Sequence, residues 1–121
     1  MSDATSRSQR DESTDTTRGR SELRARMARA LAEGGFSGVH VLSIDSAETV
    51  LTDPRMSLID YLRAHDVESI RELARELDRD KGNVSRDLKL LAKYGIVGFD
   101  TSGRAKRPFL KVEHLVVEPV F

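Results

Sequence analysis

The chain has 121 residues, of which 38% are hydrophobic and 33% are charged, and its formal net charge is zero. These values fit one compact domain with a polar segment beside it. The absence of cysteine excludes disulfide frameworks and thiolate metal sites such as zinc fingers. No apolar run approaches the roughly 18 residues of a membrane span, so we predict a cytoplasmic protein with no membrane partner.

Residues 1–19 are predicted to form a disordered polar tail. They contain no aromatic or branched aliphatic residue and mix charges of both signs. Such a segment buries too little apolar surface to offset the entropy of ordering it. Its acidic residues outnumber its arginines, which makes it a poor electrostatic arm for DNA.

Residues 20–51 are predicted to form a helix, a strand and a short helix. The stretch SELRARMARALAEGG has apolar residues at helical spacing, with Ser21 as the expected cap and Gly34 as the end. Alternation in FSGVHVLSID predicts a strand at 39–44, and SAETVLTDP predicts a capped helical turn. This segment is a candidate for the interface of a homodimer, or it pairs with the chain's own residues 115–117.

Two further helices open the remaining segment, residues 52–121. Asp53 as cap and Pro54 as first helical residue predict a helix that His65 ends. Ser69 and Glu72 form a capping box, which predicts a second helix over 69–78.

A third helix is predicted over 81–93, with Asp80 as its cap. Only a few residues separate it from the preceding helix, which is typical of a helix-turn-helix. At 100° per residue, Val84, Leu88 and Leu91 share one side and face the core. The opposite side carries Gly82, Arg86, Lys89 and Lys93, with Asn83 and Ser85 at its margins.

The rest of the chain predicts a hairpin, or wing. Gly95 caps the helix, IVGF forms a strand, residues 102–108 form a basic turn, and a strand runs from Phe109 to Val117. The predicted fold is therefore α+β and mainly α, a winged helix-turn-helix with an extra N-terminal helix and strand. Residues 78–107 contain eight cations and four acids, a net charge of +4 that the remaining chain balances.

From Val39 onward the chain resembles small predicted transcriptional regulators of archaea and bacteria with MarR/ArsR-like winged helices. The likeness is strongest in SIRELARELDRDKGNVSRDLKLLAKYGIV, and LVVEPV resembles the final strand of these regulators. The resemblance implies DNA binding, usually as a dimer, with the third helix in the major groove. It also admits antitoxin-like partners of a toxin.

We therefore predict a sequence-specific DNA-binding regulator, with repression as the favoured mode. Arg86 is expected to read guanine through its planar fork, and Asp87 either orients Arg86 or holds it away from DNA. Asn83 and Ser85 are candidates for adenine or phosphate. Backbone or minor-groove contacts are expected from Lys81, Lys89, Lys93, Arg104, Lys106 and Arg107, with Gly82 permitting close approach.

Catalysis and protein binding are the alternatives to DNA binding. His40, His65 and His114 show no metal-ligand spacing and no glycine-rich phosphate loop is present, so neither catalysis nor a cofactor is predicted. The alternative is a protein-interaction winged helix, such as the antitoxin-like partner of a toxin, with or without autorepression. Its discriminating feature would be apolar residues on the outer side of the third helix.

Overall fold

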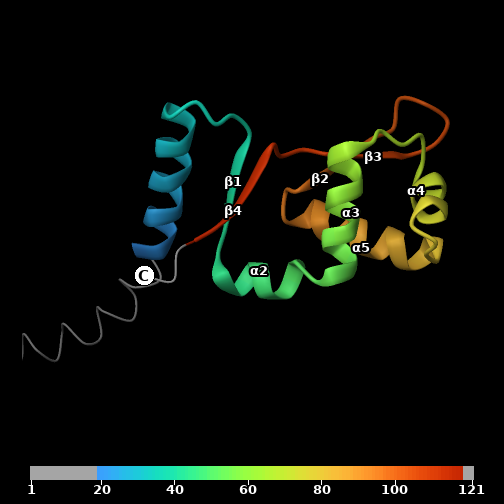
Figure 1. Cartoon of the computed structure of the whole chain (residues 1–121), viewed down its shortest axis with the longest axis horizontal. Helices are drawn as coiled ribbons and strands as arrows, with labels where there is room; N and C mark the ends of the chain where they lie inside the picture. The colour runs from blue at the N-terminus through green and yellow to red at the C-terminus, as the bar shows by residue number, and fades with distance from the viewer. Residues whose placement is uncertain (1–18, 119–121) are drawn as a thin grey trace, which may run out of the picture.

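The computed structural model describes residues 19–118 and contains a winged helix-turn-helix preceded by a helix and a strand (Figure 1). This α+β, mainly helical architecture confirms the predicted fold class. Residues 19–33 are helical. The later elements are β1 (Val39–Leu42), α2 (Ile44–Val50), α3 (Asp53–Ala64), α4 (Ile70–Glu76), α5 (Lys81–Lys93), β2 (Val97–Asp100), β3 (Arg107–Leu110) and β4 (His114–Val117). The predicted tail lies outside the described residues, except for Gly19.

The N-terminal helix begins earlier than predicted, whereas its last helical residue, residue 33, directly precedes the predicted Gly34. Ser21 lies inside the helix and does not cap it. At the other end the Gly35 amide donates to Ala32 O at 3.1 Å and the Phe36 amide to Leu31 O at 2.9 Å. Gly35 has a φ of +98°, so Gly35, and not Gly34, takes the left-handed position that closes the helix.

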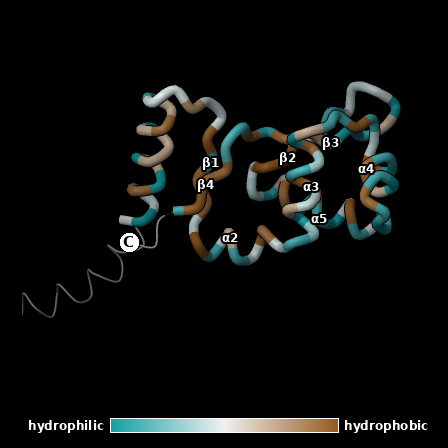
Figure 2. The backbone as a smooth tube through the Cα atoms, in the orientation of Figure 1, coloured by the Kyte–Doolittle hydropathy of each residue, from teal (hydrophilic) through white to brown (hydrophobic). Residues whose placement is uncertain are grey.

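The predicted strand from Phe109 to Val117 is wrong, because that segment divides between two sheets. β3 pairs antiparallel with β2, whereas β4 pairs in parallel with β1. Val41 lies opposite Val116, which confirms the pairing of the early strand with residues 115–117. The early strand ends at Leu42, because the Ser43 hydroxyl caps α2 through the Ser46 amide at 3.1 Å. Figure 2 shows β1 and β4 as mostly hydrophobic.

The core lies where α3, α4 and α5 meet the wing strands. Its fully buried side chains include Leu58, Leu73, Leu88, Leu91 and Ile96. Ser69 caps α4 by accepting from the Glu72 amide at 3.0 Å, as predicted. For α3 the cap is Thr52, one residue earlier than predicted, although Pro54 does lie in the first turn.

Candidate nucleic-acid interface

The helix predicted over residues 81–93 is α5, and it has one buried side and one exposed side, as its sequence predicted. Val84, Leu88 and Leu91 are each 0% exposed and form the inner side. Asp80 caps the helix by accepting from the Asn83 amide at 3.0 Å, also as predicted. The cap and the buried side together hold the opposite side of α5 at the surface.

The outer side of α5 is cationic and open. Lys81, Arg86, Lys89 and Lys93 are exposed, and among residues 19–118 no carboxylate forms an ion pair with any of them. Arg86 Nη2 donates to Asn83 Oδ1, so both predicted base-reading side chains are joined before any ligand arrives. Ser85 is half-buried at the margin.

Gly82 leaves space for the Asp80 carboxylate and the Arg86 guanidinium. A Cβ at this position would lie 3.0 Å from Asp80 Oδ2 and 3.7 Å from Arg86 Nη1. The glycine therefore leaves space for the capping carboxylate and for a guanidinium that lies along the helix surface. That role adds to the close approach of a ligand that the sequence suggested.

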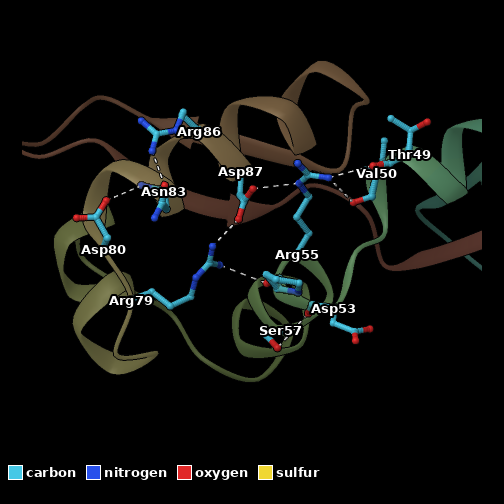
Figure 3. Close-up of polar contacts among 11 residues, drawn as sticks. Thr49, Val50, Asp53, Arg55, Ser57, Arg79, Asp80, Asn83, Arg86 and Asp87 are labelled. Carbon is cyan, nitrogen blue, oxygen red and sulfur yellow. Dashed lines mark hydrogen bonds and ion pairs between the residues drawn. The ribbon is translucent and has the colours of Figure 1, made fainter.

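Asp87 forms no ion pair with Arg86, so neither of its two predicted roles holds. Figure 3 shows the carboxylate between two other arginines, with Arg55 Nε at 3.1 Å from Oδ1 and Arg79 Nη2 at 2.6 Å from Oδ2. These arginines come from α3 and from the turn before α5. Asp87 thus ties three segments together and leaves the Arg86 guanidinium outside the ion-pair network.

The wing loop is shorter than predicted and spans residues 101–106, because Arg107 and Pro108 belong to β3. Asp100 organises the loop: its Oδ1 accepts from the Ser102 hydroxyl at 2.7 Å and amide at 2.9 Å. Arg107 Nη2 pairs with Asp100 Oδ2 at 3.1 Å. The Ser102 hydrogen bonds, followed by the Arg107 pair, lower the pKa of Asp100 to about 2.

The three cations predicted for the wing differ in their exposure and in the contacts that they make. Arg104 is exposed, with no hydrogen bond or ion pair in the described part of the chain. Lys106 Nζ lies 4.2 Å from the centroid of the Phe99 ring, a cation–π contact. Arg107 is half-buried and paired. Arg104 is the wing residue best placed to reach a ligand.

The fold brings the wing to the start of α5. Lys81, Lys106 and Ala105 line one surface hollow of about 390 Å³ together with Arg71 and Ser69 of the α4 region. Lys93 is separated from Lys81 by twelve residues of helix, roughly 18 Å, and lies outside this group. Arg71 was missed by sequence reasoning, because its own helix gives no signal that the wing tip lies beside it.

In residues 19–118 no set of three His, Cys, Asp or Glu side chains is placed to hold a metal ion. No helix in the same range has the length and apolarity to span a membrane.

The HVO_A0114 family model matches residues 50–117, which runs from the end of α2 through β4. No curated protein matches the chain. The match covers the whole winged portion and does not itself connect it to MarR or ArsR regulators.

Proposed function

We propose that this chain, which belongs to the HVO_A0114 family, is a sequence-specific DNA-binding transcriptional regulator that acts as a repressor in the cytoplasm. In this proposal α5 enters the major groove, and the wing lies on the minor groove or on phosphates. The resemblance of the winged segment to MarR/ArsR-like regulators supports the same reading.

The observation that carries the proposal is the outer side of α5. Its cations lack carboxylate partners in the described structure, while the inner side of the same helix is fully buried. Unpaired lysines and arginines at the surface favour a polyanion, and their side chains can reach both phosphates and base edges. The outer side of α5 also carries no large apolar residue of the kind a protein-binding helix needs.

A salt titration tests the proposal. Fluorescent random-sequence duplex DNA is titrated with the protein at several salt concentrations, beside the triple variant Arg86→Ala, Lys89→Ala, Arg104→Ala. We expect log affinity to fall steeply with log salt, with a shallower slope in the variant. No binding at low salt, or the same slope in the variant, would contradict DNA binding by this surface.

We further propose that the regulator is a homodimer. One winged helix reads only a few base pairs, whereas two related by symmetry read a palindrome with half-sites one turn apart. The N-terminal helix and β1 are the proposed interface, because they are not needed for the winged core. Parallel sheets are normally covered on both faces. Within residues 19–118, β1 and β4 form a two-stranded sheet in which Val117 is 41% exposed.

Binding to a protein partner, such as a toxin, is the second candidate function. The exposed aromatic residues Phe36 and Phe109, at 46% and 37% exposure, favour it. Phe109 borders a hollow of about 350 Å³ beside Leu62. Co-purification of a partner that Phe109→Ser abolishes, from a protein that fails to bind DNA, would favour this function over the first.

A further inference from the structure

A second hollow lies on the other flank of α5, at its junction with α3. It measures about 470 Å³, and three arginines line it, Arg55, Arg79 and Arg86. Among the described residues that line it, Asp87 is the one acid, so their charged groups sum to +2. Figure 3 shows Arg55 of α3 and Arg79 of the turn before α5 converging on Asp87, whereas Arg86 extends toward Asn83.

Helical geometry places the two hollows on opposite flanks of the outer side. At 100° per residue, Gly82, Lys89 and Lys93 project in nearly the same direction from the axis of α5. Lys81, in the hollow beside the wing, lies about 100° to one side of that direction. Leu90, in the arginine hollow, lies about 80° to the other side.

We propose that these two hollows bind backbone phosphates, one on each of the two strands that border the major groove. This inference rests on the proposed DNA binding by α5. A helix in a groove about 12 Å wide has its two flanks turned toward the two phosphate chains, and both flanks here are cationic. Guanidinium forks suit the tetrahedral oxygens of a phosphate, and such contacts fix orientation without reading sequence.

Asp87 acts in this site as a positioning residue. It holds Arg55 Nε and Arg79 Nη2, while Arg55 Nη1 donates to Thr49 O at 3.0 Å. The two guanidinium groups are therefore fixed before a ligand binds, which lowers the entropy that binding costs. Arg55 Nη2 forms no hydrogen bond within residues 19–118 and remains a donor for the phosphate.

The test measures the salt slope of duplex binding for Arg79→Gln and Arg71→Gln, one variant for each flank. Each is expected to lower the magnitude of the slope by about 0.9, the value for one lost phosphate contact. Arg63→Gln is the matched control, since Arg63 lies at the far end of α3 in an exposed pair with Asp60. It should leave the slope unchanged, and circular dichroism checks that each variant is folded.

Three outcomes would overturn the inference. Unchanged slopes in both flank variants, with a shallower slope in Lys89→Gln, would leave DNA binding intact and remove the two phosphate sites. If the unaltered protein binds no duplex, the proposed function fails and the inference with it. The third is a free-phosphate site: inorganic phosphate raises the melting temperature in an Arg79-dependent way while the DNA slope stays unchanged.

Arg79→Lys keeps the test decisive if Arg79→Gln fails to fold. Lysine retains the positive charge but loses the planar fork. The expected result is a slope close to that of the unaltered protein, with weaker binding at every salt concentration. A slope reduced by about 0.9 in Arg79→Lys would contradict a phosphate contact through charge at this position.

Discussion

Asp87 pairs with two arginines beside α5, Arg55 and Arg79. Its carboxylate is 16% exposed and accepts from two arginines that are themselves 20% and 23% exposed. Partly buried charges need partners, since removing one leaves the others desolvated and unpaired. Arg55 and Arg79 therefore contribute to the stability of the fold through Asp87, in addition to the phosphate contact proposed for them. No carboxylate in residues 19–118 pairs with Arg86 or Lys89.

The first prediction concerns this network. Asp87→Asn is expected to lower the free energy of unfolding by about 1.5–3 kcal/mol, the usual range for hydrogen bonds to charged groups. Urea denaturation measures the change. Asp60→Asn is the control, because its pair with Arg63 is exposed and should be worth less than about 1 kcal/mol. Equal effects of the two variants would contradict a structural role for the network.

The second prediction separates base reading from backbone contact. Arg86→Ala is expected to cost about 1–3 kcal/mol on a selected site and to relax the sequence preference there. Lys89→Ala should weaken specific and random duplexes alike, because a phosphate contact carries no sequence information. Competition binding with both duplexes measures the two effects. Equal losses on both duplexes for Arg86→Ala would remove its assignment as the base-reading residue.

At the scale of elements, the wing is held at its base by Asp100. Cross-strand pairing puts Asp100 opposite Arg107, and the same carboxylate closes the first turn of the loop through Ser102. Hydrogen bonds to the ionised form explain why the pKa of Asp100 falls from an ordinary value of 3.8 to about 2. Arg104 and Lys106 are thereby carried on a loop whose two ends are fixed.

The third prediction follows from that pKa. Asp100 has a lower pKa in the folded than in the unfolded state, so its contribution to stability is present above about pH 4. It is lost as the pH falls toward 2. Carbon NMR should show the Asp100 carboxyl titrating near pH 2. Ser102→Ala should raise that midpoint toward 3.8, since Ser102 supplies the largest cause. An unchanged midpoint would contradict this account.

The α5 helix depends on its start as well as on its buried side. The Asp80 side chain satisfies the Asn83 amide, one of the orphan donors of the first turn. Our fourth prediction is that Asp80→Ala lowers the free energy of unfolding by about 1 kcal/mol, whereas Asp80→Asn, another good cap, changes it little. Chemical denaturation of both variants measures the difference. Equal losses in the two variants would show that the charge of the carboxylate, and not the capping hydrogen bond, contributes to the free energy of unfolding.

At the scale of the whole molecule, the last strand joins the N-terminal segment to the winged core. Glu118, only 4% exposed, accepts from the Ile44 amide at 3.0 Å and from Arg24 Nη1 at 2.8 Å. The Ile44 hydrogen bond is the largest cause that lowers the pKa of Glu118. The N-terminal helix, α2 and the end of β4 therefore meet at one buried carboxylate.

The fifth prediction concerns assembly. Sedimentation equilibrium is expected to show a dimer for the full chain and a monomer after deletion of residues 1–34. The deleted form should still show helical circular dichroism, because the core helices α3, α4 and α5 are retained. It should bind a palindromic duplex more weakly and without cooperativity. A deleted form that remains dimeric would remove the N-terminal helix from the proposed interface.

The sequence by itself determined the helices and the sides they bury. The bounds of α5, its Asp80 cap and the burial of Val84 and Leu88 were all predictable. Caps involve residues three apart, and a periodic pattern is read within a dozen residues. Both are local, so no knowledge of the partner elements is needed.

Only the tertiary structure decided which distant groups meet. The sequence predicted one strand over residues 109–117. In the structure β3 pairs with β2, whereas β4 pairs with β1, which lies some 75 positions earlier in the chain. Asp87 and Arg55 are 32 positions apart, and their pairing depends on how α3 crosses α5. The two cationic hollows arise for the same reason: each is lined from separate elements, so its charge becomes visible only when the helices and the wing are packed.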